Sequence, residues 1–374
     1  MEKAGFTGEW INIWERKMKE RNSSFELLRI ISMFLIVMHH YAFHGTLDWM
    51  HYNEQIIGTL RVNIILLMLG KVGVNIFVFI GAYFLVDKKF NFRRPINLFL
   101  DTALYSFSIW LLLYFLNPKL IFNNAGIIKA IFPFPMPSGY WFVNSYIFIL
   151  LIMSFLNLLV RKLGRKEFKI VIWMLVILWS VLPTFLQIFP YQPNVSATDF
   201  GYSEGTFFIL LYFIGAYIRK YGISISSRMI GLTGVILIIN VLYIYLMSNA
   251  SLYTKLNIFQ SLYNPFSLFW SLIVFIVFTK FKFYSKVVNF ISSSMFGVYL
   301  IHENSYVRPI IWKSLINSAL LKNDWMNYLE GAVVDSFIVF VCCIVIDIFF
   351  RRLFFERLIK FISNKLNNIF SSII

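Results

Sequence analysis

Charge is scarce in this sequence of 374 residues, of which only 14% are Asp, Glu, Lys or Arg while 59% are hydrophobic. So few charges, together with a mean hydropathy of +0.71, exclude a soluble globular domain. Cysteine is scarcer still, because the adjacent Cys342 and Cys343 are the only two. Neighbouring cysteines seldom form a disulfide and offer no metal-site spacing, so we predict neither a disulfide nor a metal site. The glycine patterns of nucleotide-binding loops are also missing, which argues against a nucleotide-driven pump.

Long apolar runs, by contrast, recur along the whole chain and are separated by short polar or basic segments. We place ten membrane spans at 25–44, 62–86, 97–116, 140–160, 168–188, 204–219, 229–249, 263–280, 289–305 and 330–350. The predicted fold is an all-α integral membrane protein, a bundle of about ten transmembrane helices. An amphipathic lead-in (1–24) precedes the membrane domain (25–350), and a basic tail (351–374) follows it.

Lysine and arginine give the expected orientation of these spans. With the N-terminus in the cytoplasm, the inner segments hold 26 of the 34 basic residues and the outer segments hold seven, while Lys71 lies within a span. This asymmetry follows the positive-inside rule and requires an even number of spans, so both termini are expected in the cytoplasm. The net charge of +16 then reflects topology and contact with anionic lipid rather than nucleic-acid binding.

The first predicted span contains the most informative pair of residues, Arg29 and His40, with ten residues between them. Ionisable groups are rare inside membrane helices, so each of these two suggests a functional site. At the rise of an α-helix they lie about 16 Å apart along the axis, Arg29 near the inner face and His40 in the outer half. Because His39 points about 100° away from His40, we expect only one of these two histidines to face a reaction centre.

Two other segments bring polar side chains to the same outer depth as His40. The ninth span ends with His302 and Glu303, and the fourth begins with Tyr140, Trp141 and Asn144. Histidine suits general acid–base catalysis because its pKa lies near neutrality. The alternative for His302 and Glu303 is a structural hydrogen bond, and for His44 and His51 an interfacial position. We assume that the first, fourth and ninth spans also lie side by side in the bundle.

The cytoplasmic end of the third span carries Lys88, Lys89, Arg93 and Arg94. Such residues are expected at any cytoplasmic helix end, but a cluster beside Arg29 is also suited to binding phosphate groups through charge-assisted hydrogen bonds. Asp335 and Asp347, near the two ends of the last span, are expected to pair with Arg351 or Arg352, and the alternative is that they are gating groups.

The chain resembles the membrane acyltransferase-3 family, whose members O-acetylate surface polysaccharides and related envelope glycans. The matching stretches are RNSSFELLRIISMFLIVMHHY, GKVGVNIFVFIGAYFL, SGYWFVNSYIFILL, FFILLYFIGAYIRKYG and ISSSMFGVYLIHEN. They occur in the family's order over nearly the whole chain, and the most specific pattern is arginine–ten residues–histidine, met by Arg29 and His40. The YLIHEN ending is most similar to surface polysaccharide O-acyltransferases.

The resemblance implies an enzyme of the bacterial cytoplasmic membrane that takes an acyl group, most simply acetyl, from acyl-CoA. The donor would be a co-substrate with no permanently bound cofactor, and the acceptor would be a hydroxyl of a glycan or lipid-linked sugar. Arg29, Arg93 and Arg94 would contact the donor. His40 would act as the general base or a transient acyl carrier, and His302 or Glu303 would orient it or relay the proton. The expected acceptor contacts are Trp141, which would stack on the sugar, with Tyr140 and Asn144.

The sequence departs from the family pattern in two places. Gly81 and Ala82 stand where many relatives have serine and glycine. The C-terminal extracytoplasmic hydrolase-like domain of many relatives is not found, so a second transfer step would need a partner protein of envelope biosynthesis. Two alternatives are a polysaccharide exporter of the same fold, which needs a continuous polar path, and a non-catalytic scaffold, which tolerates changes at Arg29 and His40.

Overall fold

The computed structural model describes residues 22–45, 56–116, 140–189, 197–249, 253–351 and 355–371, and these ranges are helical without any strand. The longer helices are α2 (Ser23–His44), α3 (Ile57–Leu85), α4 (Arg93–Leu116), α6 (Trp141–Lys162), α7 (Arg165–Val176), α8 (Leu182–Ile188), α9 (Glu204–Tyr221), α10 (Ser227–Asn249), α11 (Pro265–Lys280), α12 (Lys286–Ser292), α13 (Met295–His302), α15 (Trp325–Phe350) and α16 (Glu356–Ser371). The predicted all-α membrane fold is confirmed. Most of the predicted lead-in and His51 lie outside the described residues.

Eight of the helical stretches are long and apolar enough to cross a membrane. They match eight of the ten predicted spans, with α7 and α8 joined through the π-helical turn η3 (Ile177–Val181) into one stretch. The sixth predicted span is α9, which has only 18 residues and begins with Glu204. The ninth is broken into α12 and α13 at a run of serines, 292–294, where Ser292 donates to Glu26 and Ser293 to the carbonyl oxygen of Phe290.

Polar side chains set where several of these helices begin. The side chain of Asn22 accepts a hydrogen bond from the backbone of Ser24 at the start of α2, and Asp324 caps α15 in the same way. Ser203 and Thr206 form a reciprocal capping box at the start of α9. Each cap satisfies backbone N–H groups that a helix leaves without internal partners, which fixes the residue at which the helix begins.

The segments that the charge count assigns to the inside gather at one end of the bundle. Four hydrogen bonds join them: Asn157 to Leu85 O, Lys220 to Val160 O, Arg219 to Asp87 and Ser23 N to Phe283 O. At the other end Arg61 at the start of α3 donates to Ser248 near the end of α10. This pairing of helix ends agrees with the alternating directions of the predicted spans.

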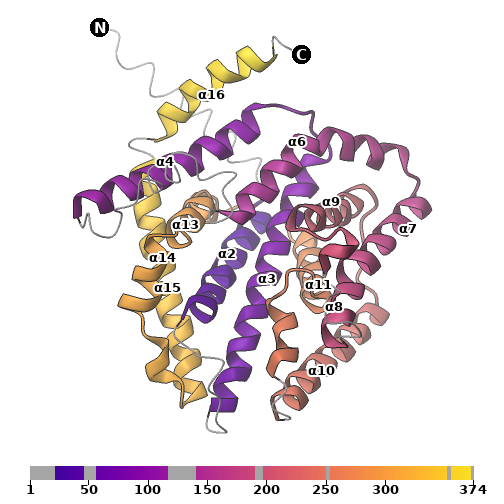
Figure 1. Ribbon diagram of the computed structural model, residues 1–374. Helices are drawn as coiled ribbons and strands as arrows, with labels where there is room; N and C mark the ends of the chain where they lie inside the picture. Colours follow the sequence, from indigo (N-terminus) through magenta and orange to yellow (C-terminus); the bar gives the residue numbers. More distant parts are fainter. Residues whose placement is uncertain are drawn as a thin grey trace.

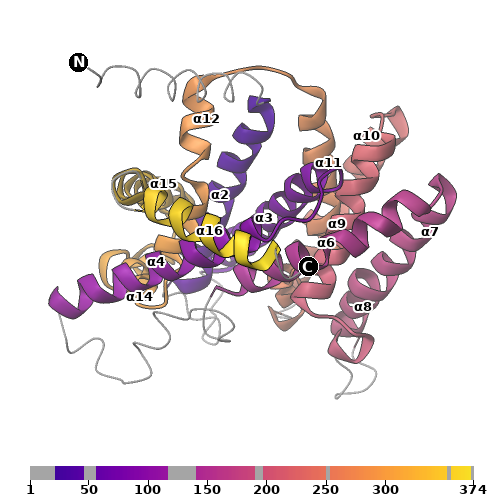
Figure 2. The same ribbon diagram turned by 90° about the horizontal axis from the view of Figure 1, so that it is seen from above.

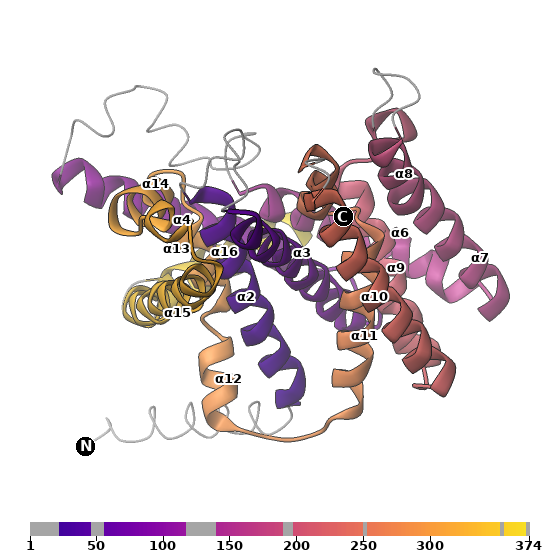
Figure 3. The ribbon, with the colours of Figure 1, turned by 90° about the horizontal axis from the view of Figure 1, so that it is seen from below.

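Helices α2 and α3 occupy the centre, with α4, α13 and α15 on one side and α7, α8 and α10 on the other (Figures 1, 2 and 3). Of the 18-residue apolar stretch of α3, 72% is buried inside the bundle, whereas the corresponding share in α10 is only 11%. A peripheral helix with so much exposed Leu, Ile and Val is suited to contact with lipid. The helix α16 lies across α4 at the end of the molecule where the chain ends (Figure 1).

Close approach of α2 and α3 depends on glycine. A side chain at Gly73 would come within 2.5 Å of the carbonyl oxygen of Ser32, and one at Gly70 would overlap the side chain of His39. The Gly70–Gly73 stretch therefore does not interrupt α3 but lets its backbone lie against α2. This contact brings the middle of α3 to the depth of the α2 histidines.

Candidate active site

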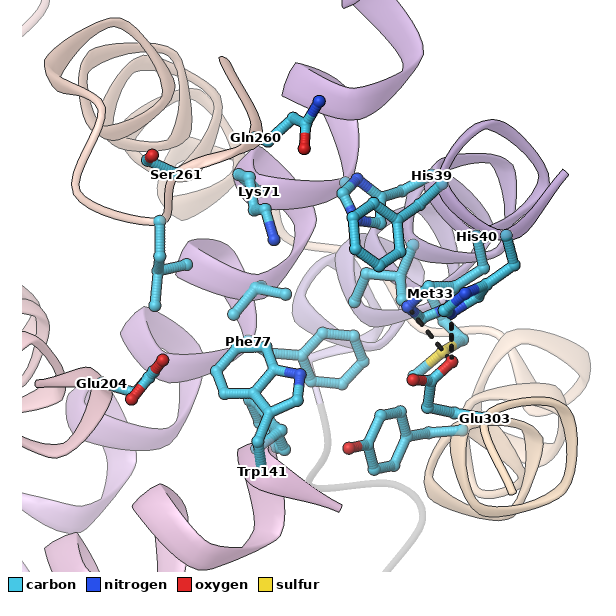
Figure 4. A pocket seen from close by; sticks show the side chains of 18 of the residues that line it. Met33, His39, His40, Lys71, Phe77, Trp141, Glu204, Gln260, Ser261 and Glu303 are labelled. Atoms are coloured by element: carbon cyan, nitrogen blue, oxygen red, sulfur yellow. Dashed lines mark hydrogen bonds and ion pairs between the residues drawn. The ribbon is translucent and has the colours of Figure 1, made fainter. Parts of the chain in front are cut away.

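A cavity of about 610 Å³ lies where α2, α3, α6 and α13 meet (Figure 4). Its wall is continued by residues beside the start of α9 and by the end of the 3-10 helix η5 (Tyr253–Gln260). The lining contains seven histidine or charged residues: His39, His40, His44, Lys71, Glu204, Glu303 and Arg308. So many ionisable groups around one cavity in a membrane helix bundle indicate a functional site.

One face of α2 forms a side of this cavity over most of the helix length. Met33, Ile36, His40 and His44 follow at spacings of three or four residues, so they lie in one stripe, and all four line the cavity. Arg29 belongs to the same stripe, one helical turn from Met33, on the side towards the predicted inner end. The cavity therefore extends along α2 from the level of the histidines almost to Arg29.

The hydrogen bonds around His302 determine which nitrogen of His40 is basic. Nδ1 of His302 lies 2.6 Å from the carbonyl oxygen of Val298, which can only accept, so Nδ1 carries the proton. In neutral His302, Nε2 is then an acceptor, and it lies 2.8 Å from Nδ1 of His40, which must donate. With its proton on Nδ1, a neutral His40 has its lone pair on Nε2.

Glu303 completes this arrangement from the end of α13. One carboxylate oxygen, Oε2, lies 3.4 Å from Nε2 of His40 and 3.3 Å from Nε2 of His44, and Oε1 accepts from Arg308 at 2.9 Å. The Glu303 side chain is only 9% exposed, so these contacts replace water around its charge. A proton gained at Nε2 of His40 would face this carboxylate directly (Figure 4).

Residues His40, His302 and Glu303 also have the composition of a metal site, since their ligand atoms lie within 4.8 Å of one another. The 2.8 Å between the two histidine nitrogens fits a shared proton better than a shared metal ion. Two nitrogens bound to one tetrahedral zinc ion at its usual bond length lie about 3.3 Å apart. The donor set therefore fits a hydrogen-bonded chain better than a metal site.

A family model described as an acyltransferase domain matches residues 22–351. The chain belongs to the acyltransferase 3 family. A search of curated proteins and a search of solved structures each returned no match. The matched region runs from the N-cap of α2 to the end of α15, so it contains the whole wall of the cavity in this membrane acyltransferase.

The two adjacent histidines of this acyltransferase, His39 and His40, both line the cavity, and that only one of them faces the reaction centre stays a prediction. The ring of His39 lies against Gly70 of α3. The Nδ1 of His39 lies 2.8 Å from the carbonyl oxygen of Leu67, which assigns its proton, as for His302. His39 thus joins α2 to α3, while His40 joins α2 to α13.

The three arginines predicted to contact the donor are not in the cavity wall. Arg29 forms an ion pair of 2.7 Å with Glu26, and Arg94 donates to the carbonyl oxygen of Lys89 at 3.0 Å. Arg93 begins α4 beside Arg94. Both Arg29 and Arg94 lie close enough to the Tyr146 hydroxyl to interact with it electrostatically. Two of the three arginines therefore flank one region of the bundle towards the predicted inner end.

Of the three residues predicted to contact the acceptor, one lines the cavity and two do not. Trp141 lines the cavity (Figure 4), whereas Tyr140 and Asn144 do not. The hydroxyl of Tyr140 donates to the carbonyl oxygen of Leu300 at 2.8 Å and accepts from Asn304 at 2.9 Å, which fastens the start of α6 to α13. Tyr140 thereby supports the segment that carries His302 and Glu303.

Sequence reasoning did not assign a role to Lys71, Glu204 or Arg308, all of which line the cavity. Lys71 had a visible signal, because it is a charged residue in the middle of a predicted span. Arg308 follows Glu303 by five residues and pairs with it only because the chain turns after α13. The two residues that differ from the family pattern serve packing: Gly81 lies against the Tyr146 hydroxyl, and Ala82 against Gly215 of α9.

Proposed function

We propose that this protein is a membrane O-acyltransferase that moves an acyl group, most simply acetyl, from acyl-CoA to a hydroxyl of a cell-surface or lipid-linked polysaccharide. The observation that carries the proposal is the basic Nε2 of His40, which faces a cavity and has a buried carboxylate beside it. This arrangement is that of a general base with a group that stabilises its protonated form.

The reaction in this proposal proceeds in one displacement. Nε2 of His40 accepts the proton of the acceptor hydroxyl while the hydroxyl oxygen attacks the thioester carbonyl carbon. The carbon–sulfur bond then breaks, coenzyme A leaves as a thiolate, and His40 returns the proton to the sulfur. While His40 is protonated, its Nδ1–H donates to His302 Nε2, and its charged ring forms an ion pair with Glu303 Oε2. A base held in one tautomer and one orientation lowers the reorganisation needed during transfer.

The donor would enter from the cytoplasmic end, with its phosphates at Arg29, Arg93 and Arg94. Guanidinium groups bind phosphates through paired, charge-assisted hydrogen bonds. The cavity lining reaches along α2 to Met33, one turn from Arg29, and in this scheme the long, narrow arm of the donor would cross that turn to reach His40. Acyl-CoA is a co-substrate in this scheme, and no permanently bound cofactor takes part.

The acceptor sugar would occupy the wide part of the cavity beside Trp141. A volume of about 610 Å³ is in the range of small-molecule sites, and aromatic rings of Trp141, Phe142 and Tyr299 line it. The flat face of Trp141 suits stacking against the C–H face of a sugar ring. A hydroxyl held there would be presented to Nε2 of His40.

The test of this proposal is the NMR spectrum of the host's envelope polysaccharide, recorded from cells with and without the protein. We expect O-acyl signals, shifted on the acylated ring protons, only when the protein is present. An equal O-acyl content in both preparations contradicts the proposal. A polysaccharide exporter would instead change the amount of glycan at the cell surface and leave its acylation unchanged.

A further inference from the structure

Lys71 is the cation of the cavity that the proposed reaction does not use. It lies in the middle of α3, the most buried of the candidate spans, and its side chain points into the cavity (Figure 4). Across the described ranges of the chain, no side chain or backbone group forms a hydrogen bond or ion pair with its Nζ. An ammonium group in a membrane helix is costly unless it has a partner, so its position in the cavity indicates a ligand.

Neither carboxylate of the cavity neutralises Lys71 at close range. Glu303 contacts Arg308, His44 and His40 at 2.9 to 3.4 Å, whereas Lys71 interacts with Glu303 only at longer range. Glu204, the second anion near Lys71, is exposed at the start of α9. Lys71 therefore contributes a positive charge that no close carboxylate of the cavity neutralises, and the complementary ligand is an anion.

Figure 4 separates the polar groups of the cavity into two poles. His40 and Glu303 form one pole, and Lys71, with Gln260 and Ser261 beside it, forms the other. His39 lies between the poles, and Trp141 and Phe77 form another part of the wall that faces both of them. A sugar stacked on Trp141 could place one hydroxyl at His40 and a second substituent at Lys71.

The position of Lys71 along the bundle excludes the phosphates of coenzyme A as its anion. Lys71 follows Gly70, which packs against His39, so Lys71 lies at the depth of the histidines. His39 is about 15 Å along the axis of α2 from Arg29, where the proposal locates the donor phosphates. An anion at Lys71 therefore belongs to the acceptor or to the reacting acyl group.

We propose that Lys71 binds an anionic substituent, a carboxylate or a phosphate, of the acceptor glycan, and that it thereby selects acidic glycans. This inference rests on the proposed function. Gln260 and Ser261 supply neighbouring hydrogen-bonding groups for the same substituent or for an adjacent hydroxyl. Lys71 is accordingly a specificity-determining residue, whereas His40 carries the chemistry.

The experiment uses the purified full-length protein in lipid nanodiscs, with radiolabelled acetyl-CoA and the host's envelope polysaccharide after mild alkaline de-O-acylation. The polysaccharide is supplied in three forms: untreated, with its carboxylates reduced to alcohols, and with its phosphates removed by hydrofluoric acid. We expect removal of the recognised anion to lower kcat/KM about 10- to 100-fold, the range of a lost hydrogen bond to a charged group. The form that loses activity distinguishes a carboxylate from a phosphate.

Lys71→Met removes the charge and keeps much of the side-chain length. It should raise KM for the untreated polysaccharide until its kcat/KM equals that for the treated form, with KM for acetyl-CoA unchanged. Lys71→Arg should restore most of the preference, and Lys322→Met, at an exposed site away from the cavity, should change nothing. The thermal unfolding temperature of each variant reports whether it is folded.

Two results would overturn the inference while leaving the proposed function intact. One is wild-type transfer that is equally fast to all three forms of the polysaccharide. The other is a loss of kcat in Lys71→Met of the same size for every form, which would assign Lys71 to the reacting acyl oxygen. If the wild-type protein transfers acetyl to no form, the proposed function fails, and the inference fails with it.

Discussion

At the scale of single residues, the chemistry depends on which nitrogen of His40 carries the proton. Two carbonyl oxygens, of Val298 and Leu67, orient His302 and His39, and His302 in turn orients His40. The acidic partner of His40 is Glu303, which His44 and Arg308 hold in place. A chain of groups fixed in this way presents one lone pair to the cavity in one direction.

Replacing Glu303 with glutamine tests the contribution of that carboxylate. The amide keeps the size of the side chain but removes the charge that faces protonated His40, so kcat should fall about 10- to 100-fold, as when a partner that orients a catalytic group is lost. KM for acyl-CoA should stay within about 2-fold, since Glu303 lies far from the expected donor phosphates. Steady-state kinetics of acyl transfer gives both constants.

The control for this substitution is Glu330→Gln, at an exposed position of α15 outside the cavity. It should leave both constants unchanged. A Glu303→Gln variant with the same kcat as the control would show that the carboxylate does not support the reaction, and His40 would then need another partner.

Much of the candidate site can be predicted from the depth in the membrane at which each residue lies along its predicted span. Span direction alone predicts that His40, His302, Glu303 and Trp141 lie at one level. In the structure His40, Glu303 and Trp141 line one cavity, and the buried His302 contacts His40 from behind its wall. Lateral positions do not follow from the sequence, because they depend on how helices pack. For that reason Tyr140, at the right depth, turns away to bond Leu300.

At the scale of elements, hydropathy predicts most helix ends within a few residues, since a span of fixed length is bounded by charges and caps. The break between α12 and α13 was not predicted. The apolar sequence continues through the break, where Ser292 donates a tertiary hydrogen bond to Glu26 and Ser293 accepts one from Arg351. Such bonds depend on partners more than 50 residues away.

The close packing of α2 against α3 gives a prediction at the same scale. Gly73→Ala would bring a methyl group within 2.5 Å of the Ser32 carbonyl oxygen, which must push the two helices apart. Overpacking of this kind costs about 1–3 kcal/mol, and it should also move the cavity-lining face of α2. We expect a lower unfolding temperature, measured by size-exclusion chromatography of heated samples, together with reduced acyl transfer.

The matched variant is Gly234→Ala in the peripheral helix α10, where a methyl group meets no atom within 4 Å. It should be neutral or stabilising by up to about 1 kcal/mol, because alanine is the better helix former. Equal unfolding temperatures for Gly73→Ala and Gly234→Ala would contradict the role assigned to the α2–α3 contact.

At the scale of the whole molecule, the hydrogen bonds between helix ends agree with the alternation of the predicted spans, and Asp347 pairs with Arg351 as predicted. Which end faces the cytoplasm is a prediction from the placement of Lys and Arg. The exposed Lys88 and Lys322 lie in segments assigned to opposite sides.

Cysteine labelling tests this orientation. In a Cys342→Ser, Cys343→Ser background, Lys322→Cys should react with a membrane-impermeant maleimide in intact bacterial cells. Lys88→Cys should react only after the membrane is made permeable. The reverse pattern would contradict the proposed entry of the donor from the cytoplasm, because it would invert the whole bundle.

The central claim is that His40 is the base for acyl transfer, and His40→Asn tests it most directly. Asparagine can still donate a hydrogen bond towards His302 but has no basic nitrogen. The measurement is transfer of labelled acetyl from acetyl-CoA to de-O-acylated envelope polysaccharide by wild-type and variant proteins of equal unfolding temperature. We predict a loss of at least about 100-fold in kcat, the lower range for a removed general base. Transfer by His40→Asn at the wild-type rate would contradict the account.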